Sequence, residues 1–179
     1  MIGGSVRSSL FPETNQTVRR KRASSTDVAV SDTIEERSRT SIDHKTLYTG
    51  KTYTRGGRDG SSRSSDGRLE IMLSPPGSDR AGTNPEQLFA AGWSACFIGA
   101  MGLAAGRRKI KLPADTAVYA EVDLANADEA YFLQARLKVS LPSLEQELAQ
   151  AIVQEAHQTC PYSKATRGNI NVELTIRRI

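Results

Sequence analysis

The chain has 179 residues, a formal net charge of +4, 38% apolar residues and two cysteines. This composition excludes a wholly membrane-embedded protein and a small domain stapled by many disulfides. So low a net charge does not by itself indicate a nucleic-acid-binding protein. The length fits one domain with room for an extension.

Residues 1–44 predict a disordered polar extension. They hold seven basic and six acidic residues, 13 serines and threonines, and a single aromatic residue, Phe11. Such a segment buries too little apolar surface to offset the entropy lost on ordering. The basic run Arg19–Arg22 suggests two alternatives to a solvated tail: a targeting segment or an anion-binding patch. The expected compartment is the cytoplasm, or a mitochondrion or related organelle if residues 1–44 are a transit segment.

Residues 45–179 are expected to form one folded domain, because they hold nine of the ten aromatic residues. Alternating residues predict strands in five segments: Tyr48–Arg55, Arg68–Leu73, Val118–Leu124, Tyr131–Leu141 and Ile170–Ile176. The glycine-rich stretch Gly56–Gly60 predicts a tight turn after the first strand, and Asn126–Asp128 predicts a hairpin turn. Strands combined with two helices indicate an α+β domain.

A long central helix is predicted from Thr83 to about Ala105. Thr83 can cap it with Glu86 three residues later, and Gly106 can end it. Residues 87–106 carry no charge, and this length could span a membrane. Because the segment is rich in alanine and glycine and has no second span, we predict a buried helix and no membrane partner. One sheet covers about one face of such a helix, so we expect a second subunit to cover the other.

The two cysteines carry the candidate chemistry. Cys96 lies in the middle of the first helix, where a buried cysteine is most simply a small apolar side chain. Cys160 lies at the end of a second helix that is predicted to begin at Ser143 and to stop before Pro161. The pair could form a structural bridge, a redox pair or neither. No metal site is expected, because only two histidines are available as further ligands.

Four strings, in this order, carry a resemblance to a known family: Gly56–Gly60, Ser64–Gly67, Gly82–Phe97 and Cys160–Asn169. They closely resemble the organic hydroperoxide resistance proteins, thiol peroxidases of the osmotically inducible protein superfamily. The resemblance covers residues 46–179, with Trp93 where the family usually has tyrosine. It implies a two-layer α+β domain with antiparallel-rich sheets and a long buried central helix, in an intertwined homodimer.

The resemblance also implies roles for individual residues. Cys96 matches the peroxidatic cysteine and Cys160 the resolving cysteine. Arg58 matches the arginine that activates the thiolate and binds the peroxide, and Glu86 the glutamate that orients this arginine. The simpler alternatives are a surface charge for Arg58 and a capping-box member for Glu86. The expected substrate pocket is apolar and is formed by Phe89, Trp93, Phe97 and Ile98.

This assignment implies reduction of alkyl or fatty-acyl hydroperoxides through a sulfenic acid and an intramolecular disulfide. No cofactor is implied, and the reductant would be a dithiol, either a lipoylated protein or dihydrolipoamide. No nucleic-acid partner is expected. The alternatives are a non-catalytic hydroperoxide or lipid sensor that uses the same cysteine pair, and a purely structural domain.

Helix geometry adds an expectation about where the site is assembled. Glu86 and Cys96 are ten residues apart, which is about 15 Å along a straight helix and about 80° out of phase. Glu86 therefore cannot reach the Cys96 of its own helix. We expect Arg58 and Glu86 to approach the Cys96 of a partner subunit. If Cys96 and Cys160 bridge without movement, their Cα atoms should lie within about 7 Å.

Overall fold

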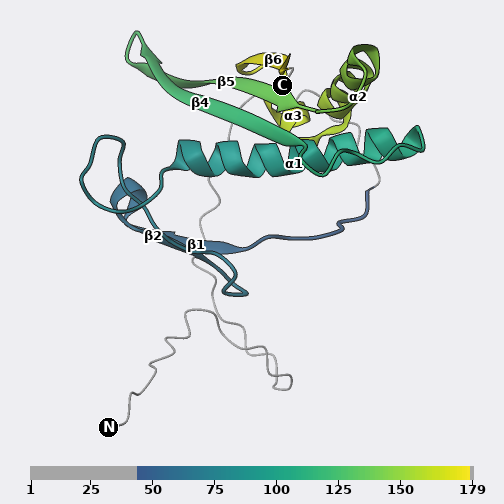
Figure 1. The fold of residues 1–179 in the computed structure, drawn as a ribbon. Helices are drawn as coiled ribbons and strands as arrows, with labels where there is room; N and C mark the ends of the chain where they lie inside the picture. The colour runs from purple at the N-terminus through teal and green to yellow at the C-terminus, as the bar shows by residue number, and fades with distance from the viewer. Residues whose placement is uncertain (1–43, 178–179) are drawn as a thin grey trace, which may run out of the picture.

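The computed structural model describes residues 44–177 and places two three-stranded sheets on opposite sides of one long helix (Figure 1). The predicted extension, residues 1–44, lies outside the described residues except for His44. The first sheet has the antiparallel order β1-β2-β3 and is formed by β1 (Thr52–Arg55), β2 (Ser61–Ser64) and β3 (Glu70–Met72). The strands are shorter than predicted, and residues 48–51 are not part of β1.

The turn between β1 and β2 is built by its glycines. Gly56 and Gly57 have φ angles of 73° and 57°, in the left-handed region that favours glycine. A Cβ at Gly60 would lie 1.7 Å from the Arg55 carbonyl oxygen, so no larger residue fits there. Between these glycines the chain forms a short 3-10 helix, η1 (Gly57–Asp59), which carries Arg58.

The second sheet is formed by β4 (Ala117–Ala127), β5 (Ala130–Ser140) and β6 (Asn171–Arg177). β4 pairs antiparallel with β5, and β6 pairs parallel with β5. The predicted alternation in β5 is confirmed, because Ala135, Leu137 and Val139 are buried. The hairpin turns later than predicted, at Asp128 and Glu129, whose positive φ angles of 49° and 67° fit a two-residue turn.

The N-cap of the central helix α1 (Pro85–Arg107) lies one residue later than predicted. Asn84, not Thr83, is the N-cap, and its side chain accepts a 2.8 Å hydrogen bond from the Gln87 backbone N–H. The Thr83 hydroxyl instead donates to the Gln87 side chain. The carboxylate of Glu86 is thereby left free for a partner outside the helix.

The predicted end of α1 at Gly106 is also wrong. The helix continues to Arg107, and the Arg108 backbone N–H closes its last turn. Both arginines bond to the carboxylate of Glu155 on α2 (Gln146–Thr159), which holds this end of α1 in helical form. The left-handed residue that follows is Lys109, with φ of 58°.

α2 begins later and ends where predicted. Ser143 has φ of 67° and is therefore outside the helix, and Glu145 takes the N-cap position. The last residue is Thr159, because Cys160 adopts an extended conformation (φ −58°, ψ 124°) before proline. A third helix, α3 (Pro161–Thr166), starts at once and turns back onto α1.

One face of α1 is the core of the chain. α1 packs against β4, α2 and α3, and its buried residues are Trp93, Phe97, Ala100, Met101, Ala104 and Ala105. The opposite face is exposed in a single chain and is lined mainly by small residues: Ala91, Ala95, Gly99, Gly102 and Gly106. Leu103 on this face is 66% exposed. The expected all-round burial of α1 is therefore not met by one chain.

By length and composition alone, α1 could cross a membrane. The core helix of a globular domain satisfies the same criteria, and 33% of its most apolar stretch is buried inside the chain. Because β4, α2 and α3 all pack against it, we interpret α1 as the core helix of the domain.

Candidate functional site

The two cysteines, 64 residues apart in the sequence, meet where α1 passes the junction of α2 and α3. Both thiols are free, and their sulfurs lie 3.4 Å apart. A disulfide bond is about 2.05 Å long, so a small movement brings the sulfurs to bonding distance. Cys160 is fully buried, whereas Cys96 is partly exposed. The pair therefore has one thiol that a reagent can reach, and a second, buried thiol in contact with the first.

The surroundings of Cys96 act on its pKa in opposite directions. Burial raises the pKa of the Cys96 thiol above its ordinary value, and the neighbouring Cys160 thiol adds to the rise. The backbone N–H of Tyr162, the second residue of α3, bonds to Cys96 and opposes the rise. Within one chain, the balance favours the protonated thiol, which is the less reactive form.

Arg58 and Glu86 form a two-pronged ion pair, as predicted. The two guanidinium nitrogens of Arg58 lie 2.9 and 2.6 Å from the two carboxylate oxygens of Glu86. The pair lowers the pKa of Glu86 and raises that of Arg58, so both groups stay charged. The Glu86 side chain is only 11% exposed, while that of Arg58 is 40% exposed. Glu86 thus fixes the guanidinium and leaves part of it open to a further partner.

Arg80 supports the turn that carries Arg58, a role that was not predicted from the sequence. Its guanidinium donates to the Asp59 carbonyl oxygen at 2.7 Å and to the Leu73 carbonyl oxygen at 3.4 Å. The loop between β3 and α1 is thereby tied to η1. Its neighbouring residues form no recognisable motif, so only the folded chain reveals the contact.

The four predicted site residues form two separate pairs within one chain. Arg58 and Glu86 lie at the N-terminal end of α1, and Cys96 lies ten residues further along the same helix. This spacing corresponds to a rise of about 15 Å. Among the described residues, the groups that shift the pKa of Cys96 do not include Arg58. Within one chain, the two pairs are therefore separate.

The expected apolar pocket is divided in a similar way. Trp93 and Phe97 are fully buried in the core, so they do not line an open surface of this chain. Phe89 and Ile98 are partly exposed and stay candidates for contact with a substrate. The ring of Tyr162, which the sequence did not single out, lies 5.9 Å from that of Phe89 and is 38% exposed.

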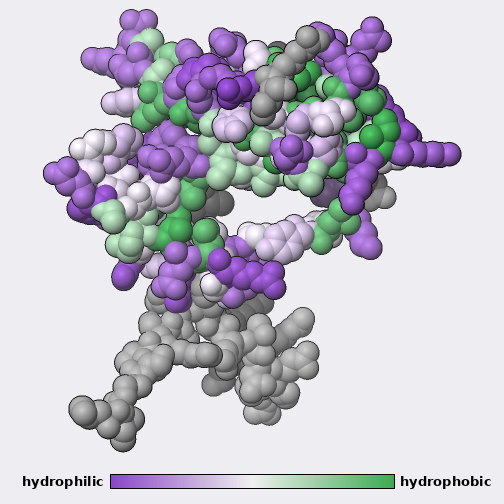
Figure 2. All heavy atoms as spheres, in the orientation of Figure 1, coloured by the Kyte–Doolittle hydropathy of each residue, from purple (hydrophilic) through white to green (hydrophobic). Residues whose placement is uncertain are grey.

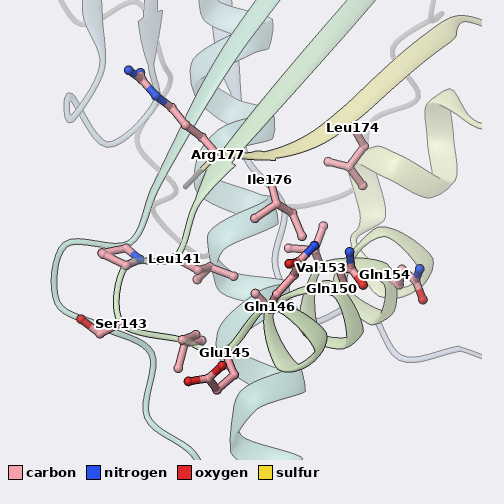
Figure 3. Close-up of a pocket in the computed structure, with 13 residues that line it drawn as sticks. Leu141, Ser143, Glu145, Gln146, Gln150, Val153, Gln154, Leu174, Ile176 and Arg177 are labelled. Carbon is pink, nitrogen blue, oxygen red and sulfur yellow. The ribbon is translucent and has the colours of Figure 1, made fainter. Parts of the chain in front are cut away.

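Two cavities formed by residues within 44–177 have neither cysteine in their lining. One cavity of about 630 Å³ lies between the start of α2 and β6, with Leu144, Val153 and Ile176 in its lining (Figure 3). A second, of about 410 Å³, has Glu86 and residues of β4 in its lining. The second cavity provides space beside the ion pair. No group of three or more His, Cys, Asp or Glu side chains within residues 44–177 could hold a metal ion.

Comparison with known proteins places this arrangement in context. The family model described as OsmC-like protein matches residues 77–175. The organic hydroperoxide resistance protein of Xanthomonas axonopodis pv. citri is 44% identical over 136 residues, which is 74% of this chain and 96% of that protein. The organic hydroperoxide resistance protein OhrB of Bacillus subtilis is 41% identical, over 73% of this chain and 98% of that protein.

Solved structures agree with these sequence matches. The crystal structure of Bacillus subtilis OhrB has a TM-score of 0.68 and 39% identity, and the match covers 74% of this chain and 100% of that one. An organic hydroperoxide resistance protein from Elizabethkingia anophelis has a TM-score of 0.70 and 41% identity, with 76% and 100% coverage. One from Vibrio cholerae, described with captopril bound in one of its active sites, has a TM-score of 0.70 and 37% identity, with 75% and 95% coverage.

Proposed function

Because the chain belongs to the OsmC-like family and, within it, to the organic hydroperoxide resistance proteins, we propose that it is a cysteine-based thiol peroxidase. Its substrates are alkyl or fatty-acid hydroperoxides, which it reduces to alcohols. The observation that carries the proposal is the pair of free thiols 3.4 Å apart, one partly exposed and one buried. A purely structural pair of cysteines needs no such difference in access.

The reaction proceeds in three balanced steps. The Cys96 thiolate attacks the distal oxygen of the hydroperoxide and the O–O bond breaks, which gives a sulfenic acid and, after protonation of the alkoxide, an alcohol. The Cys160 thiol then condenses with this sulfenic acid, forming the disulfide and releasing water. A dithiol reduces the disulfide by exchange and is itself oxidised to a disulfide.

The proposal assigns activation of the thiolate to Arg58, held by Glu86. A guanidinium stays charged at every relevant pH, so it lowers the pKa of a nearby thiol and donates hydrogen bonds to a peroxide oxygen. Since burial alone raises the pKa of Cys96, the thiol needs such a partner. The distance along α1 excludes the Arg58 held by Glu86 of the same chain, and we therefore assign this role to Arg58 of a partner subunit.

Two features of the chain support an intertwined homodimer. Every residue from His44 to Gly57 is exposed, including Leu47 at 89% and Tyr48 at 81%. Figure 2 shows an opening between the lower coloured part of the molecule, which includes this segment, and the part above it that holds α1. The small-residue face of α1 is also uncovered. A second copy would cover both surfaces and would bring its own Arg58 to the site.

The remaining assignments follow from the chemistry of the site. Phe89 and Ile98 are apolar and partly exposed on α1, the helix that carries Cys96, which favours an alkyl or acyl group over hydrogen peroxide. No cofactor is required, because the electrons come from a dithiol, for which we propose lipoyl groups. We also propose a cytoplasmic location, since the relatives described above are bacterial proteins.

Steady-state turnover tests the proposal. The purified full chain is mixed with dihydrolipoamide and either tert-butyl hydroperoxide or hydrogen peroxide, and peroxide consumption is followed. We expect faster consumption of the alkyl hydroperoxide, loss of turnover in Cys96→Ser and Arg58→Ala, and normal turnover in Arg68→Ala. Arg68 is a matched control, because it is an arginine between β2 and β3 whose side chain is 88% exposed. Equal rates for wild type and Cys96→Ser would contradict the proposal, and a single oxidation without turnover would favour a sensor.

A further inference from the structure

We propose that the buried hydrogen bond between Trp93 and Ser163 is a positioning device that holds the thiol of Cys160 against Cys96. The inference rests on the proposed function of the two thiols and goes beyond it by assigning roles to two residues outside the reacting set. The indole N–H of Trp93 donates to the hydroxyl oxygen of Ser163 at 3.2 Å.

The Trp93–Ser163 bond and the cysteine pair join the same two segments of the chain. Trp93 precedes Cys96 by three residues on α1, and Ser163 follows Cys160 by three residues at the start of α3. Residues three apart on a helix lie on the same face. The same two segments are therefore joined twice, once by the Trp93–Ser163 bond and once by the 3.4 Å contact of the two sulfurs.

Neither partner of this bond can exchange it for water. Both Trp93 and Ser163 have an exposed fraction of 0%. An indole has a single N–H donor, so removal of the serine hydroxyl leaves that donor unpaired in the core. An unpaired buried polar group destabilises the folded state, so the arrangement in which Trp93 and Ser163 are bonded is strongly favoured.

Besides the Tyr162 backbone N–H, which bonds to the sulfur of Cys96, the remaining polar contacts of α3 lie within the helix itself or next to it. Thr166 donates to the carbonyl oxygens of Tyr162 and Ser163, which stabilises α3 itself. Within residues 44–177, the side chain–side chain hydrogen bonds between α1 and the segment Cys160–Thr166 are the sulfur contact and the Trp93–Ser163 bond. Trp93 and Ser163 are therefore the side-chain pair, other than the two cysteines, that ties the segment after Cys160 to α1.

Position matters most in the second step of the proposed reaction. A sulfenic acid on Cys96 either condenses with the Cys160 thiol, releasing water, or meets a second hydroperoxide and becomes a sulfinic acid. The outcome depends on the effective concentration of the Cys160 thiol at Cys96. By holding α3 in place, the Trp93–Ser163 bond raises this concentration and favours the disulfide. The first step depends instead on Arg58 and Cys96.

The direct test is the thiol–disulfide equilibrium of the full chain in mixtures of reduced and oxidised glutathione. Oxidised glutathione takes the two hydrogens of the thiols, so the equilibrium constant reports their effective concentration without any hydroperoxide. We expect Ser163→Ala and Trp93→Phe each to lower it about tenfold, which corresponds to about 1.4 kcal/mol. The double variant should fall no further than the worse single variant, because the bond is lost only once.

Ser140→Ala is the matched control. Ser140 is also a buried serine, on β5, but its hydroxyl has no hydrogen-bond partner among the described residues. Its removal should leave the equilibrium unchanged. If Ser163→Ala fails to fold, Trp93→Phe measures the same bond from the donor side, and an aromatic ring remains in the core.

A second measurement uses the hydroperoxide. In excess tert-butyl hydroperoxide with dithiol present, mass spectrometry should show more sulfinic acid on Cys96 in Ser163→Ala than in Ser140→Ala. A wild-type glutathione equilibrium in Ser163→Ala, or additive losses in the double variant, would overturn the inference. The two proposals can fail separately. If the wild type does not react with hydroperoxide but its thiol–disulfide equilibrium depends on Ser163, only the proposed function is contradicted.

Discussion

Two inactive variants should restore each other when they share a dimer. Arg58→Ala keeps both thiols but lacks the activating guanidinium, and Cys96→Ser keeps the guanidinium but lacks the peroxidatic sulfur. In a mixed dimer, the Cys96 of the first chain faces the intact Arg58 of the second. That site is complete, and the other site lacks both groups.

The expected magnitude follows from the geometry of α1. Arg58 is held by Glu86 at 2.6 and 2.9 Å, and Cys96 lies about 15 Å further along the helix, so no site is complete within one chain. A purified mixed dimer with two-fold geometry has one working site out of two, and should show about half the wild-type rate. If each site is built within one chain, the mixed dimer has no working site and its rate is near zero.

The assay requires separation of the mixed dimer. The two variants are co-expressed with different affinity tags, purified in succession over both resins, and assayed with tert-butyl hydroperoxide and dihydrolipoamide. A mixed dimer of Cys96→Ser and Cys160→Ser is the control, since the two thiols meet within one chain and should not complement each other. A mixed Arg58→Ala and Cys96→Ser dimer that is as inactive as this control would refute the shared site.

Three further predictions follow from individual contacts. Arg58→Ala should raise the pKa of the Cys96 thiol, because burial raises this pKa and the opposing positive charge is lost. The pH dependence of the alkylation rate of Cys96 should therefore shift to higher pH, and an unchanged pH dependence would exclude Arg58 from the site. Cys160→Ser should form the sulfenic acid at the wild-type rate but accumulate sulfinic acid, whereas disulfide-linked turnover in this variant would contradict its resolving role. Glu155→Gln should be less stable than wild type at neutral pH, since Arg108 and Arg107, at the C-terminal end of α1, lower the pKa of Glu155. The resulting stabilisation is present above the unfolded pKa of 4.5. This difference in urea unfolding should disappear as the pH falls through the lowered pKa, and a constant difference would argue for lost packing instead.

Much of the fold was predictable from local patterns. The alternation of Ala135, Leu137 and Val139 predicted the buried face of β5, and Pro161 predicted the end of α2. The glycines around Arg58 predicted the turn that carries it. These predictions succeeded because each depends on one element and its immediate neighbours.

The errors concern choices that tertiary contacts decide. Thr83 and Asn84 are both good N-cap residues. The difference in capping free energy between them is small compared with that of the contacts of the folded chain. Gly106 is a good helix end in isolation, but the bonds of Arg107 and Arg108 to Glu155 extend α1 beyond it. Local sequence carries no information about a partner 47 residues away.

The site itself was predicted from the resemblance more than from residue patterns. Nothing in the spacing of Cys96 and Cys160 required their sulfurs to meet. The uncharged length of α1 by itself also fitted a membrane helix, and the prediction of a core helix depended on its alanine and glycine content and the lack of a second span. The Trp93–Ser163 bond joins residues 70 positions apart and could not be predicted. Taken alone, the tryptophan indicates only a core position, and the serine only the start of a helix.

The central claim is that a hydroperoxide oxidises Cys96 and that Cys160 completes the reaction. The most direct measurement is titration of the fully reduced chain with tert-butyl hydroperoxide without added dithiol, followed by intact-mass and thiol analysis. We expect about one equivalent per chain to remove both thiols and lower the mass by two hydrogens. Cys96→Ser should consume none. Consumption of hydroperoxide that leaves the Cys96 thiol intact would contradict the account.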